Sequence, residues 1–135
     1  MIVVDTNVIS YFYLTSEYSE LAEQLFLKNS SWAAPLLWRS EFRNVLSFYL
    51  RKEIITLQDA IQLFETAASL LHENEYEINS AQVLKLSRES GCSAYNCEFI
   101  NLAQDLNVPL VTMDKKILQC FQGTAISIQE YIEKC

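Results

Sequence analysis

Short apolar runs alternate with longer amphipathic segments along the whole chain, and this alternation limits the possible folds more than any other feature. Residues 2–4 (Ile-Val-Val) and 109–112 (Pro-Leu-Val-Thr) have the length and composition of buried strands. Between them, segments such as 36–52 carry apolar residues at helical spacing. Strands that alternate with helices are typical of a parallel sheet. We therefore expect an α/β fold with a central parallel β-sheet covered by helices.

Capping and turn residues predict the bounds of the remaining elements. Thr56 and Ser93 are suitable helix N-caps, and Gly91 is a suitable helix stop. These signals predict strands at 2–4, 31–34, 109–112 and 125–128, and helices at 8–14, 17–28, 36–52, 56–72, 79–89, 93–106 and 115–121, before a final helical turn. No stretch has the composition of a linker, so residues 1–135 are expected to form a single domain.

The cysteine and histidine content argues against a structural zinc site. The chain has 4 Cys, none of them in a C-x-x-C pair, and a single His, His72. We therefore expect the thiols to be reduced and unpaired. The longest apolar runs are far shorter than a membrane span, and no signal-peptide pattern precedes the first strand. A cytoplasmic protein without a membrane partner is expected.

The formal net charge is −7, which ordinarily argues against a nucleic-acid partner because phosphate binding depends on clustered Lys and Arg. A carboxylate cluster that is neutralised by a divalent cation would account for part of this charge. A basic protein or peptide partner fits the acidity equally well. Net charge therefore does not exclude a nuclease.

Two aspartates follow predicted strands. Asp5 comes directly after the first strand, and Asp114 follows the strand at 109–112. In open α/β sheets the ligand crevice lies beyond the carboxyl ends of the strands, so the two carboxylates can meet there despite their separation along the chain. Each residue alone is also a common helix N-cap, and propensity does not separate the two interpretations.

Glu41 lies on an apolar stripe of its predicted helix. The apolar members of this stripe are Leu37, Trp38, Val45 and Phe48. A carboxylate in such a place should be paired with a cation, bound to a metal or protonated, because its uncompensated burial is costly. A structural ion pair, or a glutamate at the edge of the stripe that reaches solvent, is the alternative to a functional site.

The helix predicted at 93–106 carries a polar residue on its apolar side. Asn96 shares a face with Phe99, whereas Glu98 lines up with Asn101 and Asp105 on what we expect to be the solvated face. An amide adds no charge. From the residues alone, Asn96 is therefore interpreted as a hydrogen bonder at the helix start or beside a site.

Four segments carry a specific combination of motifs. They are Asp5-Thr6-Asn7 after the first strand, and residues 38–44 (WRSEFRN), 93–99 (SAYNCEF) and 109–116 (PLVTMDKK). In this order they resemble the PIN-domain family, and within it the VapC-type toxins of bacterial toxin–antitoxin pairs. The resemblance covers nearly the whole chain and implies a three-layer α/β/α PIN-like domain with an acidic nuclease site.

The resemblance also implies which residues form that site. The catalytic positions would be Asp5, Glu41, Asn96 and Asp114. Of these, the three carboxylates would hold the metal, and Asn7 and Thr112 would assist by hydrogen bonds. The family usually has Asp at position 96, and Glu98 is a poor substitute because it lies about 200° around the helix. Natural divergence and a deliberate inactivating change are both compatible with Asn96.

An acidic pocket without His or Cys ligands suits Mg²⁺ or Mn²⁺, which prefer carboxylate and water oxygens. Replacing one carboxylate by an amide removes a negative charge, so weaker metal binding and reduced hydrolysis are expected. Carboxylates that cluster without a metal repel one another, and at least one of them should have a raised pKa.

The resulting expectation is a Mg²⁺- or Mn²⁺-dependent endoribonuclease, the toxin of a type II toxin–antitoxin pair, which hydrolyses RNA phosphodiesters. A cognate antitoxin and a homodimer are the implied partners, with their contact surface expected on the helices between residues 36 and 72. The alternative is a PIN-fold module that binds RNA or protein without cleaving, which Asn96 and the acidity favour. The candidate phosphate contacts are Arg39, Arg43, Arg51, Lys52, Lys115 and Lys116.

Overall fold

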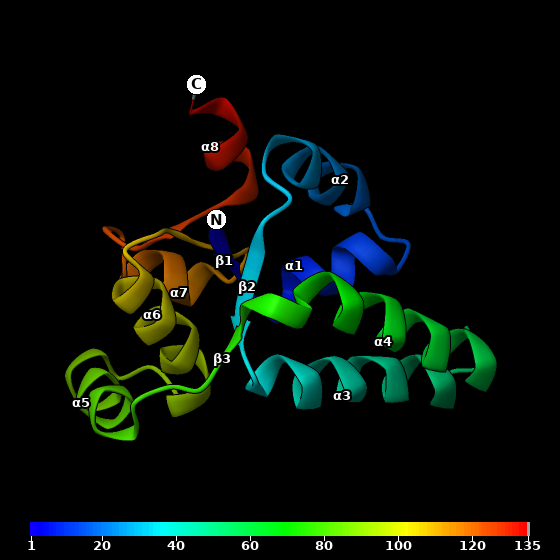
Figure 1. The fold of residues 1–135 in the computed structure, drawn as a ribbon, viewed down its shortest axis with the longest axis horizontal. Coiled ribbons are helices and arrows are strands. Elements are labelled where there is room, and N and C mark those ends of the chain that lie inside the picture. The colour runs from blue at the N-terminus through cyan, green and yellow to red at the C-terminus, as the bar shows by residue number, and fades with distance from the viewer. Residues whose placement is uncertain (135) are drawn as a thin grey trace.

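The computed structural model describes residues 1–134 and contains a five-stranded sheet in the order β3-β2-β1-β4-β5 (Figure 1). All four strand pairs are parallel. The strands are β1 (Ile2–Val4), β2 (Trp32–Pro35), β3 (Glu75–Tyr76), β4 (Leu110–Val111) and β5 (Ala125–Ile126). The predicted parallel, helix-covered sheet is therefore confirmed.

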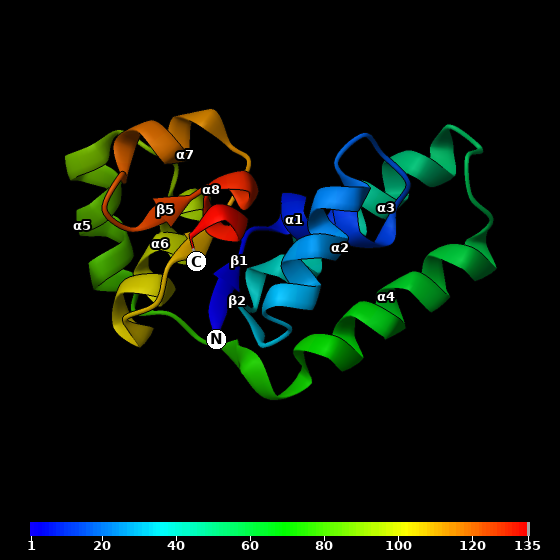
Figure 2. The same cartoon turned by 90° about the horizontal axis from the view of Figure 1, so that it is seen from above.

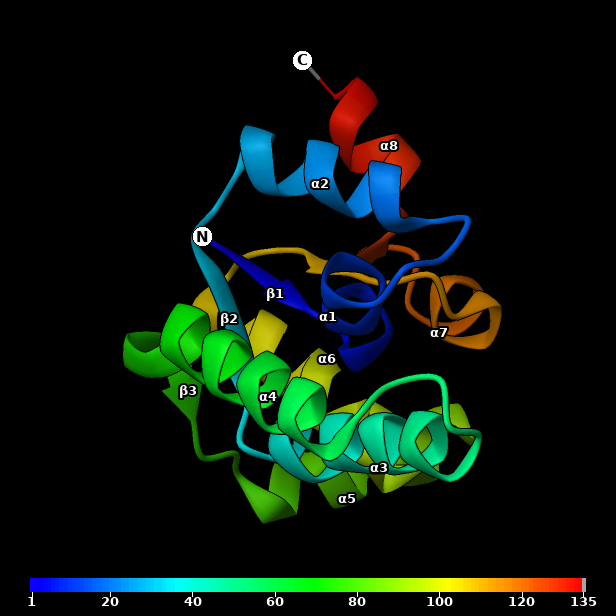
Figure 3. The same cartoon turned by 90° about the vertical axis from the view of Figure 1, so that its right-hand side faces the viewer.

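Within residues 1–134, eight α-helices flank the sheet and give three layers, α/β/α. They are α1 (Thr6–Tyr13), α2 (Ser19–Lys28), α3 (Leu37–Arg51), α4 (Leu57–Leu71), α5 (Ser80–Ser90), α6 (Ala94–Leu106), α7 (Lys115–Cys120) and α8 (Ile128–Glu133). Figure 3 shows α2 and α8 on one side of the strands and α4 on the other. Helix α6 packs against β1, β2 and β4, and α5 packs on α6. Helices α3 and α4 contact each other and run side by side away from the sheet (Figures 1 and 2).

Local capping explains most of the helix bounds. Thr56 and Asp59 form a reciprocal capping box at the start of α4. Gly91 ends α5 with a φ of 75°, a left-handed conformation that glycine adopts without a steric penalty. Ser93 accepts a hydrogen bond from the backbone N–H of Asn96 and starts α6. These helix ends lie within a residue or two of the sequence prediction.

One edge strand, β3, was not predicted from the sequence. Its two residues are a glutamate and a tyrosine, which give no strand pattern on their own. Ala34 and Pro35 of β2 pair with them in parallel register. The Glu75 carboxylate also accepts hydrogen bonds from Arg39 and Trp38. Tertiary contacts, rather than local propensity, therefore create this strand.

The core is rich in aromatic side chains. Trp32, Trp38, Phe42 and Phe99 are at most 1% exposed, and the Trp38 ring stacks on Phe64 of α4 with 5.5 Å between ring centroids. No helix in residues 1–134 is both long and apolar enough to span a membrane. The described cysteines Cys92, Cys97 and Cys120 are free thiols, as predicted, and Cys135 lies outside the described residues.

Candidate functional site

Parallel pairing of β1 with β4 brings the two predicted aspartates to the same edge of the sheet. The Asp5 N–H donates to the Val111 carbonyl at 3.0 Å, so the residues after both strands leave the sheet together. Each aspartate is also a helix N-cap: Asp5 Oδ1 accepts from the Thr6 N–H, and Asp114 Oδ1 accepts from the Ile117 N–H. The two interpretations that the sequence left open are therefore compatible, because each carboxylate caps a helix and faces the same edge.

Thr112 links the two aspartates directly. Its Oγ1 donates to Asp5 Oδ2 at 2.7 Å and accepts from the Asp114 N–H at 3.0 Å. The Asn7 amide lies beside them, with its Nδ2 at 3.4 Å from Asp5 Oδ2 and its Oδ1 accepting from the Met113 N–H at 3.4 Å. Both side chains hydrogen-bond Asp5 Oδ2 and so orient its carboxylate, and their supporting role in a nuclease site stays a prediction.

Glu41 approaches the same edge from α3, the helix that follows β2. Its Oε1 accepts a 2.7 Å hydrogen bond from Thr6 Oγ1. The apolar stripe predicted around it needs correction, because Phe48 is 47% exposed and the fully buried face of α3 is formed by Trp38 and Phe42. Glu41 is half-buried on the flank of that face, where its carboxylate lines a cavity without being completely buried.

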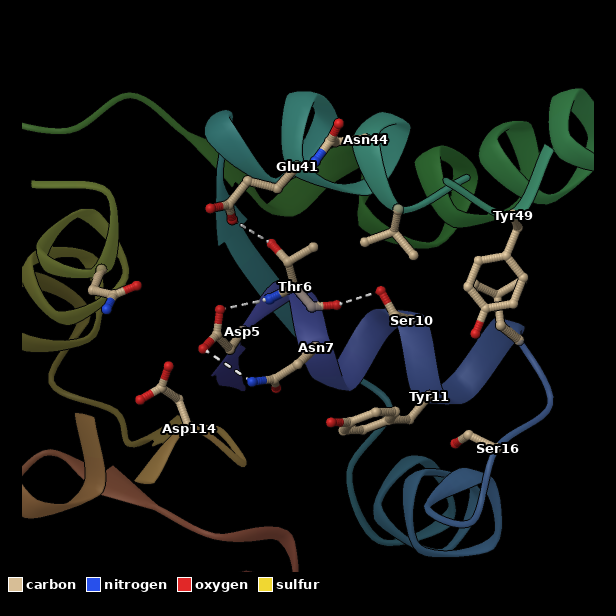
Figure 4. Close-up of a pocket in the computed structure, with 13 residues that line it drawn as sticks. Asp5, Thr6, Asn7, Ser10, Tyr11, Ser16, Glu41, Asn44, Tyr49 and Asp114 are labelled. Atoms are coloured by element: carbon tan, nitrogen blue, oxygen red, sulfur yellow. Dashed lines mark hydrogen bonds between the residues drawn. The ribbon is translucent and has the colours of Figure 1, made fainter. Parts of the chain in front are cut away.

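One cavity of about 490 Å³ joins the predicted catalytic positions. Figure 4 shows Asp5 and Asp114 facing each other across a gap, with Glu41 reaching toward it from α3. Asn96 also lines this cavity. We call this part, lined by Asp5, Glu41, Asn96 and Asp114, the acidic end. The structure brings these residues together, and their catalytic roles remain predictions.

The opposite side of α6 differs in part from expectation. Glu98 is not among the residues that line the cavity, but it lies near enough to Glu41 for its charge to raise the pKa of that residue. Glu98 is half-buried rather than fully solvated, and burial raises its pKa. Asn101, predicted to be solvated, is only 2% exposed, and its amide hydrogen-bonds the Asn79 backbone and the Gln82 side chain. Packing of α5 on α6 buries this face, and the period of α6 alone did not reveal that neighbour.

Burial raises the pKa values of two carboxylates at the acidic end, Asp5 and Glu41. Burial raises the pKa of Asp5 from 3.8 to about 6. Hydrogen bonds from Thr112 and Thr6 oppose the shift, and the negative charges of Glu41 and Asp114 add to it. Burial also raises the pKa of Glu41, opposed by the Thr6 hydrogen bond and increased by the charge of Glu98. The site is thus an unneutralised acidic cluster, which favours binding of a cation.

The donor set fits a hard divalent cation that keeps part of its water shell. Among the described residues, no group of three or more His, Cys, Asp or Glu side chains is arranged so that it could hold a metal ion by itself. Mg²⁺ commonly binds proteins through one or two carboxylates and several waters. Oε2 of Glu41 and Oδ2 of Asp114 accept no hydrogen bond within residues 1–134 and remain available as oxygen ligands.

The basic residues proposed as phosphate contacts lie in different environments. Arg39 makes a two-point ion pair with Glu75, with Nε–Oε2 at 2.6 Å and Nη2–Oε1 at 2.8 Å, so its guanidinium is already engaged. Arg43 lies over the Phe64 ring, 5.0 Å from its centroid. Lys115 and Lys116 are exposed directly after Asp114. None of these four residues lines the cavity, and neither does Arg51 or Lys52. Their part in RNA binding stays a prediction, and the ion pair of Arg39 argues against such a part for that residue.

Sequence reasoning missed two groups of residues at the cavity. Thr6 positions Glu41 through its hydroxyl, and its place directly after Asp5 was the available signal. Beyond the acidic end, the cavity continues along Tyr11, Asn44 and Tyr49. Asn44 and Tyr49 are three and eight positions after Glu41 on one helix, a spacing that places them near its face.

Comparisons with known proteins agree with this geometry. A family model described as PIN domain matches residues 2–120, whereas no match was found among curated proteins.

The chain is similar in structure to PAE2754 from Pyrobaculum aerophilum, with a TM-score of 0.76, 18% identity, and coverage of 97% of this chain and 85% of that one. A toxin–antitoxin complex from Klebsiella pneumoniae contains a similar chain, with a TM-score of 0.69, 16% identity, and coverage of 95% and 98%. FitAcB from Neisseria gonorrhoeae gives a TM-score of 0.72, 15% identity, and coverage of 96% and 99%. At these identities the structural likeness shows the fold alone, but the family model spans most of the sequence, and the chain therefore belongs to the PIN domain family.

Proposed function

We propose that the protein is a metal-dependent endoribonuclease that acts in the cytoplasm as the toxin of a VapC-like type II toxin–antitoxin pair. The observation that carries this proposal is the convergence of Asp5, Glu41 and Asp114, from three separate elements, on one cavity at the carboxyl edge of the sheet. The Klebsiella protein that resembles it belongs, by its name, to a toxin–antitoxin complex. A structurally similar FitAB protein is described as bound to a DNA fragment.

The carboxylates would hold the metal ion, and the surrounding hydrogen bonds would keep them oriented for it. A bound Mg²⁺ or Mn²⁺ would lower the pKa of a coordinated water and neutralise charge on the reacting phosphate. Thr112 and the Thr6 N–H hold Asp5, the Thr6 hydroxyl holds Glu41, and the Ile117 N–H holds Asp114. Such orientation before binding lowers the cost of forming the site.

Asn96 weakens this site without removing it. Its amide oxygen can still ligate a cation or accept a hydrogen bond from a bound water. It contributes no negative charge, so metal affinity and cleavage rate should be lower than with Asp at this position. We therefore expect Asn96 to lower the activity of the site, whether the residue is natural or engineered.

The second candidate function is a PIN-fold module that binds RNA or a protein without cleaving. Asn96 favours it, as does the net charge of −7. Both functions use the same cavity and differ only in whether hydrolysis follows binding.

The antitoxin or a second copy of the chain would cover the outer surface of α3 and α4. Leu57 is 65% exposed, Phe48 is 47% exposed and Ile61 is 44% exposed on these two helices. Together with Leu50 and Phe64, Leu57 and Ile61 line a shallow apolar groove between the helices. Apolar surface of this kind is typical of protein interfaces.

An RNase assay with controlled metal separates the two candidate functions. Unpaired RNA is incubated with the wild-type protein in Mg²⁺, in Mn²⁺ and in excess chelator, alongside Asn96→Asp. The nuclease proposal predicts slow metal-dependent cleavage by the wild type and cleavage about ten-fold faster, or more, by Asn96→Asp. Binding without any cleavage by either protein would favour the second candidate.

A further inference from the structure

The cavity has two chemically different ends. Beyond the acidic end it continues between α1 and α3, where Tyr11, Asn44 and Tyr49 line it. Figure 4 shows Tyr11 and Tyr49 projecting from different helices, both on the same side of the carboxylates. We infer that this second part, the tyrosine end, binds an unpaired nucleobase of single-stranded RNA beside the phosphate held at the acidic end. The inference rests on the proposed nuclease function and deepens it by naming how the substrate is held.

The first reason is the lack of positive charge. Among the described residues that line the cavity there is no Lys or Arg, and three are carboxylates. Nucleic-acid sites usually gain affinity by neutralising phosphates with basic side chains. Here the cavity walls supply no such side chain, so apart from the phosphate at the metal, affinity depends on contacts that carry no charge, such as stacking on aromatic rings.

The second reason is the state of the tyrosines. The Tyr11 ring is supported by Tyr18, with 4.9 Å between ring centroids and an interplanar angle of 50°. Burial, together with the phenol of Tyr18 and the charge of Asp5, raises the pKa of Tyr11, so its phenol stays neutral at physiological pH. Both tyrosines are half-buried and line the cavity, so each keeps exposed surface there that a planar ligand can cover.

The third reason is distance along the helices. Tyr11 lies six residues after Asp5, which is about 9 Å along the helix axis, and Tyr49 lies eight residues after Glu41, which is about 12 Å. These separations place the rings within reach of a nucleotide whose phosphate is at the acidic end. The exposed amide of Asn44 makes no hydrogen bond within the described residues and lines the same space. An amide offers both a donor and an acceptor, which suits the edge of a base.

The test measures binding and cleavage separately. A labelled unpaired RNA oligomer is titrated with protein in Ca²⁺ by fluorescence anisotropy, and cleavage is followed in Mg²⁺ and Mn²⁺. We expect Tyr11→Ala and Tyr49→Ala each to weaken binding roughly ten- to hundred-fold, while Tyr11→Phe and Tyr49→Phe stay within about three-fold of the wild type. Tyr95→Ala is the matched control, because Tyr95 is 63% exposed and does not line the cavity. It should bind like the wild type.

An oligomer with abasic positions tests the same inference on the unmodified protein, so that misfolding of a variant cannot obscure the result. It should bind the wild type about as weakly as ordinary RNA binds the alanine variants. If wild-type protein cleaves RNA, but the abasic oligomer and both alanine variants show full affinity, the inference is overturned and the nuclease proposal stands. If the wild type neither binds nor cleaves RNA, both fail.

Discussion

Two carboxylates of this chain, one buried and one half-buried, have opposite electrostatic surroundings. Asp5 is buried, with 8% of the residue exposed, and Glu75 is half-buried. Glu75 is neutralised by Arg39 and also accepts from the Trp38 indole N–H. The hydrogen bond from Arg39 lowers the pKa of Glu75, whereas burial raises that of Asp5 to about 6.

The difference is between a carboxylate whose charge is paired within the fold and one whose charge is not. Glu75 joins β3 to α3 and leaves no charge unpaired, so its burial serves the fold. Asp5 has neutral hydrogen-bond donors and two further carboxylates near it, and within the described residues it has no cationic partner. Carboxylates kept in this state are typical of sites that await a cation or a proton.

The largest expected effect is on RNA cleavage, which should depend on Asp5 and not on Glu75. Asp5→Asn should lower metal-dependent cleavage about a thousand-fold, because it removes charge from the centre of the acidic end. Glu75→Gln should leave cleavage per folded molecule unchanged. Initial rates on unpaired RNA, corrected for the folded fraction by circular dichroism, measure both. An equal loss of cleavage rate in Asp5→Asn and Glu75→Gln would show that the two carboxylates do not differ in function.

The second prediction concerns pH. The raised pKa of Asp5 means that, between about pH 4 and 6, the folded protein holds a proton that the unfolded chain has lost. Binding of this proton adds to the free energy of unfolding. The added free energy is fully present below about pH 4 and is lost as the pH rises through about 6. The total change is at most about 3 kcal/mol.

Urea denaturation of the wild type and Asp5→Asn from pH 4 to 7.5 measures this change. The stability difference should shift in favour of Asp5→Asn as the pH rises, and Mg²⁺ should offset the shift for the wild type alone. Parallel pH profiles for the two proteins would show that Asp5 is not destabilised by its surroundings.

The third prediction concerns the stability of the fold, which should depend on the ion pair of Glu75. Glu75→Gln should lower the free energy of unfolding by about 1 kcal/mol, because the two-point pair with Arg39 is lost and the partial exposure of Arg39 screens part of its strength. Glu77→Gln is the matched control, since Glu77 is exposed and two residues away. Denaturant titration at pH 7 measures both, and equal stability of the two variants would contradict the structural role of Glu75.

The smallest expected effect is at Glu98. Glu98→Gln should change metal affinity and cleavage by no more than about two-fold, because Glu98 lies outside the acidic end. It should also lower the pKa of Glu41 by removing a nearby negative charge. NMR titration of Glu41 and RNase rates test these two statements independently. Loss of cleavage in this variant would mean that the third acid of the site is Glu98 rather than position 96.

The fold was largely predictable because local signals agree with the tertiary structure. Capping residues such as Thr56, Ser93 and Gly91 act within one turn, so sequence spacing is enough to find them. Strand β3 escaped prediction because its two residues become a strand only through β2 and Arg39. Asn101 was misplaced for the same reason, since the helix that buries it is a separate element.

The candidate site was predictable to a different extent. Its acidic end follows from strand ends and family motifs, both of which are visible in the sequence. The tyrosine end was not visible, because Tyr11 and Tyr49 belong to helices whose relative placement depends on the packing of α1 against α3. The raised pKa of Asp5 could be expected from clustering, but its main cause is burial, which only the structure supplies.

Calorimetric titration of Mn²⁺ into the wild type and Asp5→Asn at pH 7.5 tests the central claim most directly. The account predicts one ion per wild-type chain, held by a site that Asp5→Asn abolishes although the variant stays folded. Mn²⁺ binding with equal affinity and stoichiometry in both proteins would place the metal elsewhere and contradict the assignment of the acidic end as the metal site.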